Sequence, residues 1–268
     1  MAIVTQVNAF TDRIGGGNPA GVCLLKQSVS EEWMLHVAKE MNLSETAFLW
    51  EQEHGYRLRW FTPVTEVPLC GHATLASAHV LWEKGYVPKS KTIDFDTKSG
   101  RLTASRKNHW IQLDFPALQL ESCPDMPFPL ESFFTGVPVL FLGKTDTDYI
   151  AELPSEGAVK NFNPNFDWLE QLEDKLDLVI TSRSDKEGID FVSRCFAPNS
   201  GIGEDPVTGS IHCALAPYWE TKLKKSSFSA EQLSERGGFL KVTAAGDRVY
   251  LQGQAICVRE TVIDHFGA

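Results

Sequence analysis

Two segments of the chain place polar side chains where a helix can begin. In the first segment His72 follows Gly71, and in the second Ser210 follows Gly209. The first turn of a helix carries unpaired N–H groups and a partial positive charge, so it binds carboxylates, and a glycine there lets the ligand approach the backbone. Each glycine alone is equally compatible with a tight turn. Their presence in both segments favours one shared anionic ligand, a small carboxylate.

Three other side chains are of types suited to proton transfer. Glu45 lies between a predicted helix and an apolar strand; it is either an exposed residue or, if it faces a cleft, a carboxylate that carries a proton. Cys70 precedes the first helix start and is either a reactive thiol or a small buried residue. Asp205 precedes the second helix start and is either a helix cap or a residue of the same cleft.

These residues lie within a pattern that occurs twice. The sequence Arg-x-Phe-x-Pro spans 59–63 and again 194–198, and the offset between the two phenylalanines, 196 minus 61, is 135, about half of the 268 residues. Cys70 and Asp205 each stand nine residues after their phenylalanine, and each precedes an alanine-rich segment that ends in Trp-Glu. The repeat predicts two similar halves that face one another across a cleft, each supplying part of one site.

The elements that position these residues are predicted to repeat as well. In the first half, Ser30 caps a helix over 31–41, and the second half has a counterpart helix over 167–176. Strands are predicted at 20–25, 46–50, 56–61, 92–96, 101–105, 110–115, 239–243, 248–251 and 255–259. Short strands around one alanine-rich helix per half indicate an α+β fold, in which each domain is a curled, mostly antiparallel sheet around a central helix.

Prolines mark the expected boundary between the halves. Pro124, Pro127 and Pro129 crowd one segment, and proline interrupts both helices and central strands. We therefore predict domains at 1–116 and 129–268 with a linker over 117–128. The extreme C-terminus could pack back on the first domain.

Composition argues against several classes of function. The net charge of −10, without a large Lys and Arg cluster, argues against nucleic acid as a partner. No apolar run reaches the length of about 18 residues that spans a membrane, and the N-terminus lacks the features of a secretory signal, so we expect a cytoplasmic protein. The six cysteines show no metal-binding spacing, His72 and His79 have no third ligand nearby in the sequence, and no dinucleotide motif is present. We expect neither a metal nor a cofactor.

Several motifs, taken in order, resemble one family. They are Gly17–Val22, Leu43–Phe48, Phe61–Pro63 with Glu66, Leu69–Thr74, Arg194–Pro198 and Glu204–Ser210. Together they resemble the PhzF-like phenazine-biosynthesis isomerases, a family related to diaminopimelate epimerase, and the resemblance covers essentially the whole chain. It implies two epimerase-type domains, an active site in the cleft between them and a homodimer.

The resemblance also implies a role for each candidate residue. Glu45 matches the general acid and base that moves a proton between carbons, and His72 and Asp205 match residues that bind or orient the substrate. The implied substrate-binding set is Asn18, Gly71, Gly209 and Ser210. The implied reaction is the cofactor-free isomerisation of trans-2,3-dihydro-3-hydroxyanthranilate, a hydrogen shift within a cyclic amino acid.

The sequence leaves two other interpretations of the function open. The related epimerases use one thiol from each domain, whereas here Cys70 matches the first thiol and Asp205 occupies the second position. This difference disfavours two-thiol chemistry but leaves a racemase that uses Cys70 and Asp205 as opposed bases. The remaining interpretation is a non-enzymatic protein that binds a small ligand or another protein.

Overall fold

The protein is a mixed α/β structure made mostly of strands. The computed structural model describes three stretches of the chain, 1–127, 130–198 and 202–263. The chain divides into two compact units, one formed by Met1–Phe115 with the chain from Tyr250 onward, and the other by Pro116–Val249. The described part of the expected linker therefore belongs to the second unit, and the last strand of the expected second domain belongs to the first unit.

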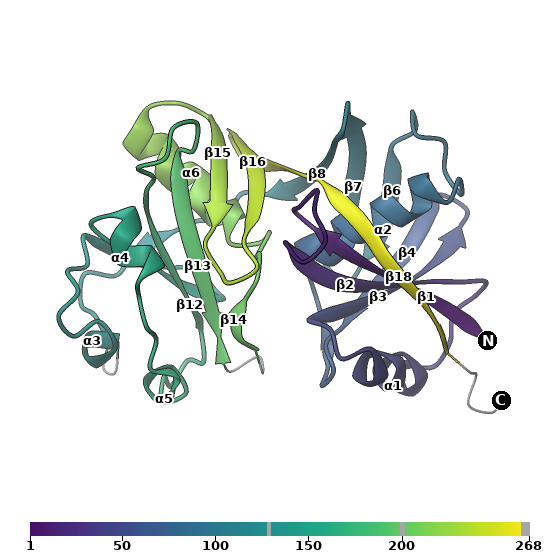
Figure 1. Ribbon diagram of the computed structural model, residues 1–268, viewed down its shortest axis with the longest axis horizontal. Coiled ribbons are helices and arrows are strands. Elements are labelled where there is room, and N and C mark those ends of the chain that lie inside the picture. Colours follow the sequence, from purple (N-terminus) through teal and green to yellow (C-terminus); the bar gives the residue numbers. More distant parts are fainter. Residues whose placement is uncertain (128–129, 199–201, 264–268) are drawn as a thin grey trace. The chain divides into compact units, whose positions relative to one another are not determined.

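In its described residues, the first unit combines a strand array with two helices, α1 (Glu31–Met41) and α2 (Gly71–Glu83). Its strands are β1 (Ala2–Ala9), β2 (Asn18–Leu25), β3 (Glu45–Gln52), β4 (Gly55–Phe61), β5 (Glu66–Val67), β6 (Ile93–Thr97), β7 (Gly100–Lys107), β8 (Trp110–Pro116) and β18 (Ala255–Ile263). The pairs β2–β3 and β4–β6 are parallel, whereas β1–β2, β3–β4, β4–β5, β6–β7 and β7–β8 are antiparallel. In Figure 1, α2 lies against β1, β2, β3 and β18.

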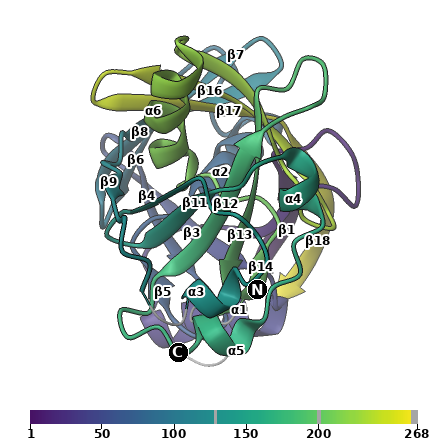
Figure 2. The same cartoon turned by 90° about the vertical axis from the view of Figure 1, so that its left-hand side faces the viewer.

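The second unit repeats this order of strand pairs. Its helices are α3 (Leu130–Phe133), α4 (Glu156–Lys160), α5 (Phe166–Leu169) and α6 (His212–Leu223). Its strands, most of which are labelled in Figure 2, are β9 (Glu121–Ser122), β10 (Phe141–Lys144), β11 (Asp148–Glu152), β12 (Asp177–Arg183), β13 (Phe191–Ala197), β14 (Ile202–Asp205), β15 (Ser227–Gln232) and β16 (Gly238–Ala245). The pairs β11–β12 and β13–β15 are parallel, and β10–β11, β12–β13, β13–β14 and β15–β16 are antiparallel. Strand β17 (Arg248–Gly253) then leads from the second unit into the first.

Each predicted strand overlaps an observed one. The prediction succeeds because a strand with one face on the core and the other toward solvent alternates apolar and polar residues. In β8 and β17 the side chains alternate between buried and partly exposed positions. The first helix is also placed as predicted, since the Ser30 hydroxyl accepts a hydrogen bond from the amide of Trp33 at 3.3 Å. Its buried face carries Trp33, Met34, Val37, Ala38 and Met41.

Both alanine-rich helices are buried, but only the first begins where the sequence predicts. Helix α2 starts at Gly71 and is apolar on nearly all sides, as expected for a helix enclosed by a sheet. Helix α6 starts at His212, so the prediction of a helix start at Gly209 is wrong. Residues 209–211 instead form a tight turn, in which the amide of His212 donates to the carbonyl of Gly209 at 3.1 Å.

The counterpart helix predicted over 167–176 is also wrong. Helix α5 ends at Leu169, and the chain continues in tight turns, with the amide of Leu172 donating to Leu169 at 3.2 Å and that of Lys175 donating to Leu172 at 3.3 Å. Lys175 has a φ of 57°, which lies outside the helical region. Leu169 and Leu172 are nevertheless buried, so their spacing reflects packing into the core rather than a long helix.

The repeated Arg-x-Phe sequence forms the same contacts in both units. The Arg59 guanidinium lies 5.1 Å from the ring centroid of Phe61 and donates two hydrogen bonds, 2.7 and 2.6 Å long, to the carboxylate of Glu66. The second unit has equivalent distances of 4.9, 2.7 and 2.8 Å among Arg194, Phe196 and Glu204. In each unit the arginine therefore joins a short strand, β5 or β14, to the longer strand beside it.

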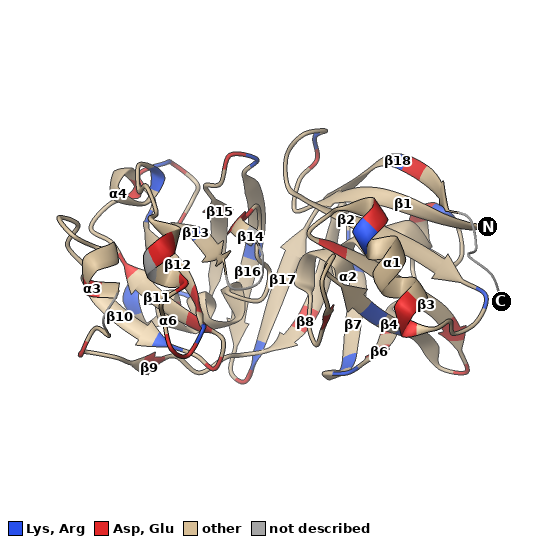
Figure 3. Cartoon of the chain, turned by 90° about the horizontal axis from the view of Figure 1, so that it is seen from below, with Lys and Arg blue, Asp and Glu red and all other residues tan. Residues whose placement is uncertain are grey.

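Charged side chains of both signs are interspersed along the elements of each unit (Figure 3). Within the described stretches of the chain, no helix combines the length and the apolar character needed to cross a membrane.

Candidate active site

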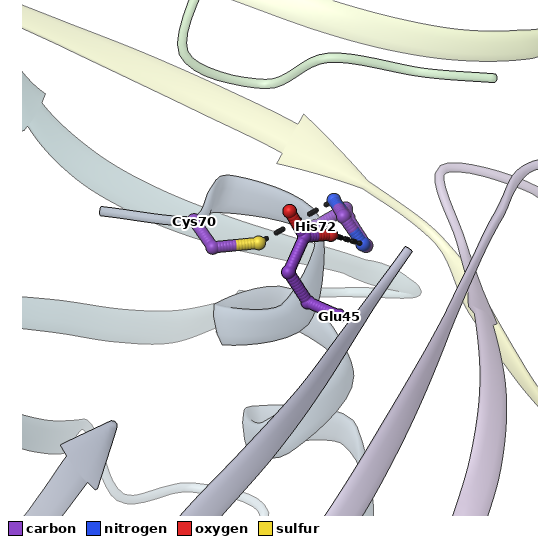
Figure 4. Close-up of side chains that lie close together, drawn as sticks. All are labelled: Glu45, Cys70 and His72. Atoms are coloured by element: carbon purple, nitrogen blue, oxygen red, sulfur yellow. Dashed lines mark hydrogen bonds and ion pairs between the residues drawn. The ribbon is translucent and has the colours of Figure 1, made fainter. Parts of the chain in front are cut away.

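Glu45, Cys70 and His72 come together in the first unit, as Figure 4 shows. Glu45 is the first residue of β3, and Cys70 and His72 flank Gly71 at the start of α2. Because α2 packs against β2 and β3, the beginning of the helix meets the beginning of the strand. Folding thus brings Glu45 to two residues that lie at least 25 positions further along the sequence, as 70 minus 45 shows.

The three side chains are close together and withdrawn from solvent. Nε2 of His72 lies 3.1 Å from Oε2 of Glu45, and the exposed fractions of the two side chains are 5% and 13%. Sγ of Cys70 lies 3.5 Å from Nδ1 of His72. Among the described residues, neither Nε2 nor Oε2 has a hydrogen-bond partner, so the ring N–H and the carboxylate oxygen are close but not aligned. Both atoms can therefore still bind a ligand.

Asn18 and Ser44 hold the other side of the imidazole ring. Nδ2 of Asn18 lies 3.2 Å from Nδ1 of His72, and the Ser44 hydroxyl donates to Oδ1 of Asn18 at 3.1 Å. This arrangement suits a neutral ring whose Nδ1 accepts. When Nδ1 carries a proton, the Asn18 amide must turn its oxygen toward the ring, and the Ser44 hydroxyl can then accept instead of donate. The network therefore serves either protonation state of His72.

Burial and neighbouring charge set the ionisation of the cluster. Burial raises the pKa of the Cys70 thiol, and the Glu45 carboxylate adds to this rise. Burial by itself lowers the pKa of His72, because it disfavours the charged ring. The pKa nevertheless lies well above the usual value, because the ring faces Cys70 and Glu45. Since a protonated thiol carries no charge, Glu45 is the neighbour that favours the imidazolium at neutral pH. The result is a carboxylate facing a cationic ring beside a neutral thiol.

Folding groups His72 with two side chains of metal-binding types other than His79. One ligand atom from each of Glu45, Cys70 and His72 lies within 4.8 Å of the other two. Folding brings a glutamate and a cysteine to the ring, although neither stands at a metal-binding spacing from it in the sequence. His79, seven positions further along α2, is not a member of this group.

In the second unit, Asp205 braces the turn that precedes α6. The Thr208 hydroxyl donates to Oδ2 of Asp205, whose residue is 8% exposed. The side-chain amide of Gln232 donates to the backbone carbonyl of Asp205 at 2.8 Å and accepts from the amide of Thr208 at 2.8 Å. Because α6 has Ile211 at its N-cap, Asp205 is not the cap of that helix.

Gly209 and Ser210 form the same turn. Gly209 is buried, whereas Ser210 is partly exposed. The carbonyl of Ser210 accepts from the amide of Cys213 at 2.9 Å, which ties the turn to the first residues of the helix. The structure thus places Asn18, Gly71, Glu45 and His72 in the first unit, and Asp205, Gly209 and Ser210 in the second.

The second unit also holds a carboxylate cluster that the sequence does not indicate. Asp177 is the first residue of β12, the counterpart of β3, so it has the place in its unit that Glu45 has in the first. It is the register partner of Asp148 across the parallel pair β11–β12. Burial, together with the nearby carboxylates of Asp148 and Asp205, raises the pKa of Asp177 to about 7. A carboxyl group in this unit is therefore also able to hold a proton near neutral pH.

Comparison with known proteins gives one consistent family. The sequence profile of the PhzC-PhzF family, described as phenazine biosynthesis-like protein, matches residues 7–261. A protein of Halalkalibacterium halodurans named an uncharacterized isomerase is 52% identical over 252 residues, which cover 94% of each chain. A protein of Pseudomonas aeruginosa with the same description is 45% identical over 253 residues, covering 94% of this chain and 95% of the relative.

Solved structures agree with this match. The crystal structure of a phenazine biosynthesis protein of the PhzF family from Enterococcus faecalis has a TM-score of 0.90 and 38% identity, covering 97% of both chains. A hydroxyproline epimerase from Agrobacterium vitis has a TM-score of 0.65 at 8% identity and covers 97% of this chain and 91% of its own. At that identity the likeness shows a shared fold alone.

Proposed function

This chain belongs to the PhzC-PhzF family of phenazine biosynthesis-like proteins, and from that premise we propose that it is a cofactor-independent isomerase of a small carboxylic acid. The proposed substrate is a cyclic amino acid, and the reaction moves a proton between ring carbons, as in the isomerisation of trans-2,3-dihydro-3-hydroxyanthranilate. The observation that carries the proposal is the Glu45 carboxylate, largely withdrawn from water and 3.1 Å from His72. The isomerase names of two relatives support the reaction class.

Glu45 is the proposed acid and base. As a base, its carboxylate removes a proton from the donor carbon, and the electrons of the broken C–H bond shift into the π system of the ring. As an acid, it returns the proton to a second carbon on the same face. The imidazolium of His72 stabilises the carboxylate before the transfer, and a single carboxylate within reach of both carbons needs no second base.

The remaining candidate residues are proposed to hold the substrate. The carboxylate of Asp205 suits the amino group of an amino acid, and the Ser210 hydroxyl with the backbone amides at Gly71 and Gly209 suits its carboxylate. Asn18 acts through His72, because it contacts Nδ1 of the ring at 3.2 Å. Asn18 is therefore a positioning residue in this proposal.

Replacing Ser210 with alanine is expected to weaken substrate binding without stopping the reaction. The loss of one hydrogen bond to a charged group corresponds to about 1–3 kcal/mol. We expect a higher KM with little change in kcat, measured by steady-state kinetics. Ser226→Ala, which removes an exposed serine hydroxyl from the same unit, is the matched control and should leave KM unchanged. A Ser210→Ala variant with unaltered KM would remove Ser210 from the binding set.

A racemase that uses Cys70 and Asp205 is the second candidate, because these residues occupy equivalent places in the sequence repeat. The raised pKa of Cys70 argues against it, since a neutral thiol is a poor base. Cys70→Ser is therefore expected to retain most of the turnover, measured as kcat beside a thermal melting curve. Loss of activity in a variant that melts like the wild type would favour the racemase, which would also exchange the substrate α-hydrogen in deuterated water.

The function is tested by incubating the protein with trans-2,3-dihydro-3-hydroxyanthranilate and with related cyclic amino acids, and by following each compound by NMR. We expect a change in double-bond position with no change in mass in ordinary water. A folded protein that converts none of these compounds would contradict the proposed reaction class.

A further inference from the structure

Three ligand atoms of the kinds that bind zinc lie together at the start of α2. Glu45 offers a carboxylate oxygen, Cys70 a sulfur and His72 a ring nitrogen, all within 4.8 Å of one another. Taken as whole residues, Cys70 is 6% exposed and His72 is 4% exposed. The cluster is therefore not a set of surface side chains that happen to meet. Two of its atoms, Nε2 of His72 and Oε2 of Glu45, are buried and have no hydrogen-bond partner among the described residues.

Glu45 and His72 already have the spacing of two ligands on a small tetrahedral ion, and rotation of the Cys70 side chain adds the third. With metal bonds of about 2.0–2.3 Å, tetrahedral ligand atoms lie roughly 3.3–3.8 Å apart. Nε2 of His72 and Oε2 of Glu45, at 3.1 Å, are close to that separation without any movement. The sulfur of Cys70 lies 3.5 Å from Nδ1 of the same ring, so its side chain must rotate toward Nε2 to complete the set.

We propose that Glu45, Cys70 and His72 bind a thiophilic divalent cation such as Zn²⁺. Sulfur and imidazole nitrogen select zinc and similar ions over Mg²⁺ and Ca²⁺, which prefer oxygen ligands. Three protein ligands leave the fourth tetrahedral position to water or to another small ligand. Folding assembles this site from residues whose spacing in the sequence does not indicate a metal site.

The neighbours of His72 suit this role once the Asn18 amide turns its oxygen, which now accepts from Ser44, toward Nδ1. Zinc bound at Nε2 leaves the proton of the neutral ring on Nδ1, where Asn18 can accept it through its amide oxygen while its NH₂ group donates to Ser44. The metal thus replaces the Nε2 proton of the imidazolium. Binding also breaks the S–H bond of Cys70 and forms a metal–sulfur bond, so both protons pass to solvent and no oxidation or reduction occurs.

Metal binding and the proposed catalysis use the same carboxylate. A cation on Glu45 occupies the lone pair that would accept the substrate proton, so Zn²⁺ is expected to inhibit the isomerase. This second statement depends on the proposed function, whereas the metal site does not. A spectroscopic test of metal binding therefore remains informative even if no isomerase activity is found.

The test replaces zinc with Co²⁺, whose absorption spectrum reports its ligands. We expect the reduced wild-type protein to bind one Co²⁺ per chain, with the visible bands of a four-coordinate ion and a thiolate-to-cobalt charge-transfer band in the near ultraviolet. Added Zn²⁺ should abolish both signals by displacement. A wild-type protein that develops no thiolate band at excess Co²⁺ would overturn the proposal.

Two variants identify the thiolate. Cys70→Ser should lose the charge-transfer band and lower the affinity for Co²⁺ by at least about 100-fold. Replacing a residue that merely hydrogen-bonds a metal ligand already lowers the affinity by up to about 100-fold, and loss of a ligand itself should cost at least as much. Cys257→Ser removes an exposed thiol with free access to added metal and should leave the spectrum unchanged. A band retained in Cys70→Ser would overturn the assignment. If Cys70→Ser fails to fold, His72→Gln with the same expected loss of affinity provides the test.

Discussion

Replacing Glu45 with glutamine is expected to lower kcat by roughly two to four orders of magnitude, the usual contribution of a positioned acid or base. Glutamine preserves the size of the side chain, but its amide cannot accept a proton from carbon. Substrate binding should survive, because Glu45 is proposed to act on the migrating proton rather than on the carboxylate of the ligand. The measurement pairs single-turnover kinetics with a binding constant from calorimetry.

The matched control is Glu51→Gln, which makes the same change on the same strand. Glu51 lies near the other end of β3 and is exposed, whereas Glu45 begins the strand and is largely withdrawn from solvent. The control variant should retain wild-type kinetics. Near-normal turnover by Glu45→Gln would remove Glu45 from the mechanism.

Truncating the repeated phenylalanine is expected to destabilise either unit. Phe61 is 1% exposed and packs edge to face on Phe48 at a centroid distance of 5.6 Å, and Phe196 is fully buried, with its centroid 6.1 Å from that of Phe162. Phe61→Ala and Phe196→Ala should each lower the free energy of unfolding by about 3–5 kcal/mol, because each leaves a cavity in a core. Urea unfolding followed by circular dichroism measures both.

Tyr86→Ala serves as the control for these truncations. Tyr86 is 55% exposed, so losing its ring should change the free energy of unfolding by no more than about 0.5 kcal/mol. A loss below about 1 kcal/mol at Phe61 or Phe196 would mean that the repeated phenylalanine is not a core residue of that unit.

Much of the fold follows from the sequence because its strongest signals are local or periodic. Alternation places the strands, Ser30 marks the start of α1, and the alanine-rich segment after Gly71 predicts a buried helix. The repeat of Arg-x-Phe at an offset of 135 residues predicts equivalent packing in two units, which the contacts of Arg59 and Arg194 display.

Other features depend on contacts that sequence patterns do not contain. The leucines of 167–176 have the spacing of a helical face, but a left-handed residue, Lys175, and successive tight turns bury them without a helix. Gln232 holds the Asp205 turn from 27 positions downstream, and no motif marks it. Likewise, the distance of His72 from Glu45 depends on how α2 packs on β3, so the possible metal ligands become visible only in the folded chain.

The most direct test of the proposed proton transfer uses a substrate deuterated at the donor carbon, with trans-2,3-dihydro-3-hydroxyanthranilate as the first compound. The wild-type protein converts it in ordinary water, and mass spectrometry and NMR locate the deuterium in the product. A single carboxylate shielded from solvent should return part of the label to the acceptor carbon, because the bound acid exchanges slowly with water. We predict partial retention of deuterium at that carbon. Complete replacement by solvent hydrogen would contradict transfer by Glu45 alone.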